Sequence, residues 1–240
     1  MDAPRGAEAR AFVAGATGYT GREVVRALAR RGGTVRAHVR PDSPRLAEWR
    51  ARFAAPGVTV DETAWREAEL TATLAAFRPT HLFALLGTTR GRAAAAERAG
   101  APAADYEAVD YGLTALLLHA AAATPGRGPR FVYLSSLGAN VATRNAYLRA
   151  RGRAEALIRE SGLPYLIVRP SFISGADREE RRPIERAAAR ALDVGTAALA
   201  VLGAARLRAR FRPRTAAELA ESIVRLALSG RAGVVEAEEL

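Results

Sequence analysis

The sequence predicts an α/β fold in which helices cover both faces of a parallel sheet. Two observations lead to this fold class. Short apolar runs alternate with helix-like patterns along the whole 240-residue chain. The strand candidates, such as the run 81–86, are almost continuously apolar, as in strands that are buried on both faces. Because no Pro/Gly/Ser-rich linker divides the chain, we expect 1–240 to form a single domain.

The expected elements follow one another as strand, then helix. The first strand, 10–14, leads directly into a helix at 20–31. The last long helix begins at Thr215, which forms a capping-box pattern with Glu218. The segment 172–214 does not continue the alternation of strands and helices. We expect it to be a small substrate-facing part beyond the carboxyl ends of the strands. The expected strands are 10–14, 34–39, 57–60, 80–86, 130–135 and 164–168, and the expected helices are 20–31, 43–54, 65–77, 105–123, 145–161, 183–201 and 215–229.

The loop between the first strand and the first helix has the glycine spacing of a dinucleotide-binding site. In such a loop the first glycine allows a tight turn and the second lets the backbone approach a pyrophosphate. The third glycine lets helix and strand pack closely, and the helix start attracts the phosphate charge. The alternative is a strand–helix turn that is merely rich in glycine. The expected cofactor contacts in this segment are Gly15, Thr17, Gly18, Tyr19, Thr20 and Gly21.

The residue at the end of the second strand favours NADP over NAD. NAD-binding proteins place an acidic residue about 20 positions beyond the glycine loop, on the ribose 2′-hydroxyl. This chain has Arg40 there, and a guanidinium suits the 2′-phosphate of NADP. The alternative is that Arg40 is an ordinary surface residue. Asp61, after the third strand, is expected either on the adenine side of the cofactor or at the start of a turn.

Small and hydroxyl-bearing residues follow the strand at 80–86. Gly87, Thr88 and Thr89 come directly after it, where they can line the ribose and phosphates of the cofactor. Simple turn formation is the alternative interpretation. The strand at 130–135 ends in a second such group.

That second group begins a candidate proton relay. Ser135 and Ser136 lie at the end of the strand, and Tyr147 follows eleven positions after Ser136. Arg151 is four positions beyond Tyr147, so the two share one face of a helix. A cation next to a tyrosine favours tyrosinate, and a serine hydroxyl can orient a carbonyl oxygen. An ordinary surface contact between Tyr147 and Arg151 is the alternative.

These segments occur in the same order in the short-chain dehydrogenase/reductases. The chain most resembles their atypical, NAD(P)H-binding branch, which includes the Tat-interacting oxidoreductase and nitrogen-regulator-like proteins. The resemblance covers about residues 10–230. It implies a Rossmann-type doubly wound sheet with an NADPH site at Gly15, Gly18, Gly21 and Arg40.

The resemblance also implies a catalytic set. Ser136 (or Ser135) and Tyr147 would take its first two roles, and Pro170 with Ser171 would lie near the nicotinamide. The third member of this family's set is a lysine four residues after the tyrosine, and here that position is Arg151. Arginine keeps the charge but presents a larger planar group. Compositional drift with retained function, or a lapsed active site with retained cofactor binding, would each explain the change.

Composition narrows the classes of partner. The net charge is +11, and every basic side chain is arginine. These arginines are mostly interleaved with glutamates, which indicates a solvated surface rather than a nucleic-acid partner. In one segment, 206–214, arginines alternate with other residues, the pattern of an extended segment with one basic face. We expect this segment to be either an exposed strand or loop, or a docking surface for a phosphate, a lipid headgroup or a partner.

Other classes are disfavoured by what the sequence lacks. It has no cysteine, and its three histidines have no second metal ligand at a useful spacing, so we expect no metal. No apolar run is long enough for a membrane span, and residues 1–10 lack the apolar core of a signal peptide. We therefore expect a cytoplasmic protein, either a monomer or a homodimer.

The leading interpretation is an NADPH-dependent oxidoreductase that transfers hydride to a carbonyl-like small molecule. Tyr147 would act as acid, Ser136 would orient the substrate, and Arg151 would support the ribose. A second interpretation is a non-catalytic NADP(H)-binding sensor or partner-binding protein. A third, an epimerase or dehydratase acting on an activated sugar, is disfavoured because the C-terminal part leaves little room for a nucleotide sugar.

Overall fold

The protein is built around one seven-stranded sheet in which every neighbouring pair of strands is parallel. The computed structural model describes residues 9–87, 106–171, 173 and 211–240. The strands lie in the order β3-β2-β1-β4-β5-β6-β7, so the chain reverses direction across the sheet between β1 and β4. Their bounds are β1 Arg10–Ala14, β2 Thr34–His38, β3 Val58–Asp61, β4 His81–Ala84, β5 Arg130–Leu134, β6 Tyr165–Arg169 and β7 Gly233–Glu236. The predicted doubly wound fold is confirmed.

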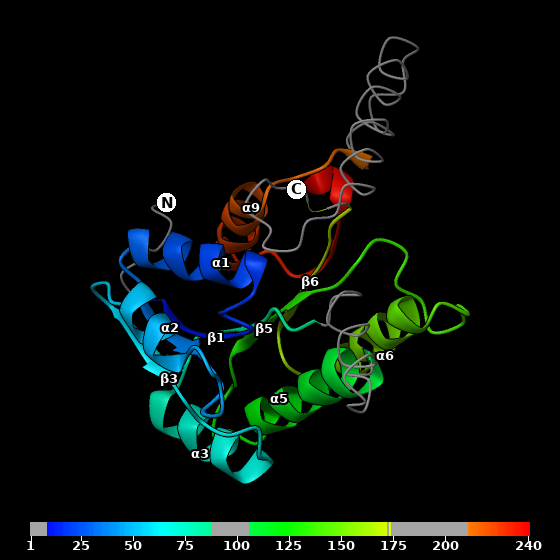
Figure 1. Cartoon of the computed structure of the whole chain (residues 1–240). Helices are drawn as coiled ribbons and strands as arrows, with labels where there is room; N and C mark the ends of the chain where they lie inside the picture. Colours follow the sequence, from blue (N-terminus) through cyan, green and yellow to red (C-terminus); the bar gives the residue numbers. More distant parts are fainter. Residues whose placement is uncertain (1–8, 88–105, 172, 174–210) are drawn as a thin grey trace.

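Helices cover both faces of this sheet. Helices α1, α2 and α9 pack on one face, whereas α3, α5 and α6 pack on the other (Figure 1). Among the residues described, no helix has the length and apolar composition that crossing a bilayer requires. The helix expected at 183–201 lies outside the described residues. The bounds are α1 Tyr19–Arg30, α2 Leu46–Arg52, α3 Glu67–Phe77, α5 Leu113–Ala122, α6 Ala146–Glu160 and α9 Ala216–Leu228, with a π-helical turn η2 at Glu107–Gly112 and a 3-10 turn η3 at Ala237–Glu239.

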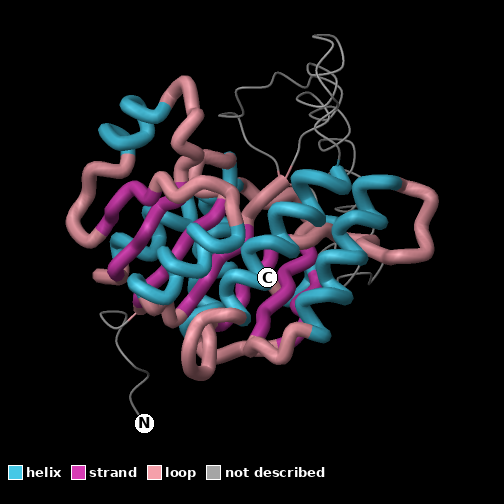
Figure 2. Tube along the Cα trace, turned by 90° about the horizontal axis from the view of Figure 1, so that it is seen from below, coloured by secondary structure: helices cyan, strands magenta, loops and turns pink. Residues whose placement is uncertain are grey.

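The continuous apolar strands serve two cores, one on each face. In β5, Val132 and Leu134 belong to the core beneath α1 and α9, whereas Phe131 and Tyr133 belong to the core beneath α3, α5 and α6. This follows from the two-residue period of a strand, which sends successive side chains to opposite faces. The strands run side by side through the middle of the molecule (Figure 2). The sheet is thereby a rigid platform, and the loops at its carboxyl edge carry the candidate site.

Near the end of the chain, the sequence predicted the capping box of α9 but not strand β7. The capping box at the start of α9 is present, with the Thr215 side chain accepting from the Glu218 N–H and the Glu218 side chain accepting from the Thr215 N–H. Strand β7 was not predicted. It is four residues long and only Val235 is buried in it, so its sequence carries little periodic signal.

Candidate functional site

The glycine loop is closed so tightly that two of its positions exclude any side chain. Gly15 has φ +81°, and a Cβ there would lie 2.5 Å from the Leu85 carbonyl oxygen. A Cβ on Gly21 would lie 2.0 Å from the Gly15 carbonyl oxygen. The first position therefore brings the loop against the segment after β4, and the second brings α1 against the loop. These contacts fit the tight turn and the close approach of the helix that the spacing predicted, and contact of the loop with a cofactor stays a prediction.

The start of α1 is suited to an anion. Gly18 is the N-cap and has no side chain to cap the helix, and the first turn contains no acidic residue. The positive end of the helix dipole therefore faces the loop with no carboxylate in the first turn to neutralise it. Of the other predicted contacts, Thr17 and Tyr19 are half-buried and Thr20 is buried. The Arg22 guanidinium lies 5.2 Å from the centre of the Tyr19 ring.

Arg40 and Asp61, the two residues expected at the adenine end of the cofactor, lie in different environments. The Arg40 side chain, just beyond β2, is 58% exposed, and its Nη1 lies 3.5 Å from Asp42 Oδ2. Asp61, at the end of β3, is buried and accepts hydrogen bonds from the Thr63 hydroxyl at 2.7 Å and the Thr63 N–H at 3.1 Å. It also accepts from Arg36 at 3.2 Å. In this structure Asp61 organises the turn after β3, as one of the two interpretations expects.

The two candidate serines after β5 are separated by the fold. The Ser135 hydroxyl is buried and donates to Glu155 Oε1 at 2.6 Å. Glu155 also accepts two hydrogen bonds from Arg169, at 2.6 and 2.8 Å. Burial by itself raises the pKa of Glu155, but these hydrogen bonds from Arg169 and Ser135 outweigh it and hold the pKa below its ordinary value. Ser136 is half-buried, and among the described residues its hydroxyl has one contact, at 3.4 Å from the Leu137 carbonyl oxygen. Ser136 is thus the serine better placed to meet a substrate.

Tyr147 and Arg151 share a face of α6, as predicted. The helix begins at the N-cap Asn145, whose side chain accepts from the Leu148 N–H at 3.1 Å. Tyr147 is half-buried, and its ring centre lies 5.3 Å from Arg151 Cζ and 5.4 Å from the ring centre of Tyr106. The Tyr147 ring therefore lies within cation–π distance of the Arg151 guanidinium.

Arg151 is buried and bound by the protein through both terminal nitrogens. Its Nη1 donates to the Leu134 carbonyl at 2.6 Å and to the Tyr133 hydroxyl at 3.2 Å. Its Nη2 donates to the Leu86 carbonyl at 2.9 Å and lies 2.7 Å from Asp110 Oδ1. The guanidinium therefore links the carboxyl ends of β4 and β5 to η2, a role that the sequence interpretation did not include.

The charges around Arg151 determine its protonation. Burial by itself lowers the pKa of Arg151, but the neighbouring Tyr133, Tyr147 and Asp110 outweigh it and raise the pKa. Burial also raises the pKa of Tyr133 to about 12. Arg151 is therefore permanently charged and Tyr133 is a neutral hydroxyl at physiological pH. At physiological pH, therefore, neither Arg151 nor Tyr133 can transfer a proton.

Asp110 and Tyr133 are the site residues that sequence reasoning missed. Asp110 is fully buried in the π-helical turn η2. An acidic residue within the apolar pattern of 105–123 was the available signal, because a buried acid requires a partner. Tyr133 gave no signal of its own, since it lies in an apolar strand that packs in the core.

The Arg151 guanidinium also explains why position 87 is a glycine. A Cβ on Gly87 would lie 2.6 Å from Arg151 Nη2, so a side chain at this position would displace the guanidinium. Thr88 and Thr89 lie outside the described residues. Gly87 therefore packs directly against the Arg151 guanidinium.

The predicted residues after β6 pack near the same edge. The Pro170 carbonyl accepts from the Leu137 N–H at 3.0 Å, and Ser171 Oγ donates to the Arg212 carbonyl at 3.0 Å. Positions 206–210 of the arginine-rich segment lie outside the described residues. Of the rest, Arg212 is exposed, whereas Arg214 donates to the carbonyl of Leu240. Arg214 thus stabilises the C-terminus.

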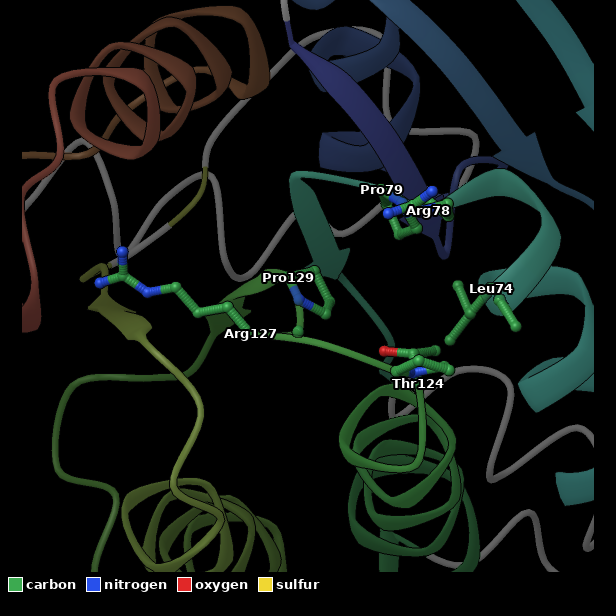
Figure 3. Close-up of a pocket in the computed structure, with 9 residues that line it drawn as sticks. Leu74, Arg78, Pro79, Thr124, Arg127 and Pro129 are labelled. Atoms are coloured by element: carbon green, nitrogen blue, oxygen red, sulfur yellow. The ribbon is translucent and has the colours of Figure 1, made fainter.

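A surface pocket of about 480 Å³ lies at the opposite edge of the sheet. It lies between the end of α3, the end of α5 and the turns before β4 and β5 (Figure 3). Its lining residues are Leu74, Ala75, Arg78, Pro79, Thr124, Pro125, Arg127, Gly128 and Pro129. Since parallel strands place their carboxyl ends together, this pocket is separate from the glycine loop and Tyr147.

The candidate site has two properties that fit a dinucleotide. The tight packing at Gly15 and Gly21 places the start of α1, which has no acidic residue in its first turn, directly after the end of β1. In addition, the buried Nε of Arg151 has no hydrogen-bonding partner among the residues that the structure describes. Within the same part of the chain, no group of three or more His, Asp or Glu side chains is placed to hold a metal.

Comparison with known proteins identifies the family and agrees with the fold. A family model described as NAD(P)H-binding matches residues 15–203. Similar solved structures include a protein of Burkholderia cenocepacia J2315 provisionally assigned as an epimerase, with TM-score 0.64 and 20% identity over 97% of this chain and 78% of that one. The Bordetella bronchiseptica enzyme WbmH in complex with NAD+ has TM-score 0.65 and 15% identity, over 95% and 75% of the two chains. UDP-N-acetylglucosamine 4-epimerase from Bacillus cereus has TM-score 0.60 and 15% identity, over 95% and 78%. At these identities the likeness shows the fold, and no curated protein matched the chain.

Proposed function

The chain belongs to the NAD(P)H-binding family, and from this we propose that it is an NADPH-dependent oxidoreductase of the short-chain type, in its atypical branch. Its substrate is a small molecule with a carbonyl-like group. The observation that carries the proposal is the position of Tyr147 directly over the charged Arg151, on the helix that packs beside the loops after β4 and β5.

Each residue has a distinct task in the proposed reaction. When bound, NADPH supplies a hydride from its nicotinamide ring to the carbonyl carbon. The Tyr147 hydroxyl donates its proton to the carbonyl oxygen, and the nearby positive charge of Arg151 stabilises the tyrosinate that is left. The Ser136 hydroxyl donates a hydrogen bond to the same oxygen and orients it. Arg40 binds the 2′-phosphate at the other end of the cofactor.

One observation favours a second candidate function, a non-catalytic NADP(H)-binding protein. Both terminal nitrogens of Arg151 are bound by the protein, so they are not available to the ribose as a lysine ammonium would be. Cofactor binding through the glycine loop does not depend on this cation. The two functions therefore differ in turnover and not in affinity for NADPH.

The experiment that tests the proposal combines binding and turnover. We expect NADPH to bind more tightly than NADH in a fluorescence titration, and a panel of aldehydes and ketones to yield NADPH oxidation. We expect Tyr147→Phe to reduce that rate by about 100-fold or more, as loss of a general acid does, while NADPH still binds. Binding with no turnover on any carbonyl would favour the second candidate, and equal affinity for the two cofactors would overturn the NADP assignment.

A further inference from the structure

Among the described residues, the pocket between the ends of α3 and α5 is lined by two arginines and by no acidic side chain. We propose that this pocket binds a small organic carboxylate, with Arg78 holding the carboxylate group and the apolar body lying against the pocket walls. The pocket lies where β4 and β5 begin, at the opposite edge of the sheet from the glycine loop and Tyr147. Binding there therefore does not depend on the proposed oxidoreductase function.

The two arginines of the pocket, Arg78 and Arg127, are free to bind an anion. Most of the arginines that the structure describes pair with a carboxylate. At the same edge of the sheet, Arg10 donates to the Phe77 carbonyl. The side chains of Arg78 and Arg127 are exposed and have no hydrogen bond or ion pair with any described residue. An anion can therefore bind them without breaking an existing bond.

The backbone at Arg78 has a conformation that suits glycine better than arginine. Arg78 is the C-cap of α3, and among the described residues it is the one non-glycine residue with a positive φ, at 52°. A side chain in this left-handed region is sterically unfavourable, whereas glycine adopts it freely. We infer that arginine at this position contributes through its guanidinium and not through its backbone.

Arg78 is also the arginine closer to the apolar walls. It lies beside Pro79 at one side of the pocket, whereas the Arg127 side chain extends away from Leu74 and Thr124 at the other side (Figure 3). Arg78 therefore provides the direct contact with the carboxylate, and Arg127 adds positive charge at longer range.

The local charge fits a singly charged group. The C-terminal ends of α3 and α5 both reach the pocket, and each carries roughly half a negative charge from its unpaired carbonyls. Two guanidinium groups outweigh these ends and leave about one positive charge. A carboxylate balances that charge, and a planar guanidinium can bind both of its oxygens.

The walls of the pocket are apolar and rigid. The apolar lining residues are Leu74, Ala75, Pro79, Pro125 and Pro129. Each proline ring fixes the backbone φ, and the turn before β5 is fixed again at Gly128, where a Cβ would lie 2.5 Å from Leu163 Cδ2. The volume of about 480 Å³ is typical of small-molecule sites. Such a preformed wall can bind an apolar ring with little loss of conformational entropy.

The test measures the binding of benzoate to the full chain by calorimetry at constant ionic strength. Two further probes each lack one feature of benzoate, because benzyl alcohol has the ring without the charge and inorganic phosphate has charge without the ring. We expect benzoate to bind about tenfold more tightly than either. Saturating NADPH should leave the benzoate affinity unchanged, since the two sites lie at opposite edges of the sheet.

Two variants of Arg78 and one matched control locate the site. We expect Arg78→Gln to weaken benzoate binding about tenfold, the equivalent of one charge-assisted hydrogen bond. Arg78→Gly should give the same loss, and it relieves the left-handed backbone, so it serves if Arg78→Gln does not fold. The control is Arg225→Gln, which removes the charge of an exposed arginine of α9 that also has no described partner. It should leave the benzoate affinity unchanged.

Several results would overturn the proposed site. Absence of benzoate binding is one, and equal affinity for benzoate and either of the other probes is another. Wild-type affinity in the Arg78 variants would show that benzoate binds elsewhere, and so would competition by NADPH. An equal loss in Arg225→Gln would mean that net charge, rather than this pocket, attracts the anion.

Discussion

Arg151 Nη2 lies 2.7 Å from Asp110 Oδ1, and both side chains are almost completely buried. Two charges at this depth are stable only when each has a partner, because desolvation of an unpaired ion is costly. The pair therefore explains why a site expected to contain lysine tolerates arginine. Substitution of either residue should therefore change the stability of the protein by a measurable amount.

The first prediction concerns Arg151→Lys. An ammonium keeps the charge but leaves several of the Leu86, Leu134, Tyr133 and Asp110 acceptors without a donor. We expect the free energy of unfolding to fall by about 2–4 kcal/mol, as for other broken buried ion-pair networks. Urea unfolding measures this change. Arg153→Lys, two positions later and exposed, should shift stability by no more than about 0.5 kcal/mol. Equal effects of the two substitutions would contradict a special role of the buried Arg151 contacts.

The sequence predicted those features that are determined by residues close together along the chain. The glycine loop, the strand–helix order and the capping box at Thr215 are encoded within a few residues, and the structure contains them. The partners of Arg151 could not be predicted, because Leu86 and Asp110 are 65 and 41 positions away in the sequence. The sequence favoured Ser136 with Ser135 as the alternative, and no neighbouring residue showed which of the two hydroxyls the protein itself binds. That choice depends on Glu155, which α6 brings to the end of β5.

The two serines provide a second prediction. Because the Ser136 hydroxyl has only a weak protein contact, Ser136→Ala should lower kcat for carbonyl reduction by about 100-fold, with stability close to wild type. Ser135→Ala removes a buried donor to Glu155 and should cost about 1–3 kcal/mol of stability. Steady-state kinetics and urea unfolding on both variants separate the roles. The reverse pattern would show that Ser135 is the catalytic serine.

The glycine loop provides a third prediction. In Gly21→Ala the new methyl group would lie 2.0 Å from the Gly15 carbonyl oxygen, so the loop must move. We expect NADPH affinity to fall more than tenfold and stability to fall by about 1–3 kcal/mol, as in overpacked sites. Calorimetric titration and urea unfolding test the two effects. Gly112→Ala is the control, since its Cβ meets nothing closer than 3.4 Å and should leave NADPH binding intact.

The buried Glu155 network predicts how stability depends on pH. Hydrogen bonds from Arg169 and Ser135 outweigh burial and hold the folded-state pKa of Glu155 below its ordinary value of 4.5. Its contribution is therefore complete above that value and is lost as the pH falls through the folded-state pKa. Melting curves between pH 7 and pH 3 should show that Glu155→Gln, although less stable at pH 7, loses less stability on acidification than the wild type. Parallel curves would exclude Glu155 as an acid-sensitive group.

The last prediction concerns the choice of cofactor. The Arg40 side chain is 58% exposed, and its nearest carboxylate oxygen among the described residues, that of Asp42, is 3.5 Å away, so the guanidinium can turn to a phosphate at little cost. In Arg40→Glu the phosphate would meet a carboxylate, and NADPH affinity should fall by about 10–100-fold. NADH affinity should rise or stay unchanged, because a carboxylate can accept from the ribose 2′-hydroxyl. Arg26→Glu makes the same charge change at an equally exposed position of α1 and should alter neither affinity by more than about twofold. An equal loss of NADPH affinity in both variants would mean that net charge, rather than a bond from Arg40, selects NADP.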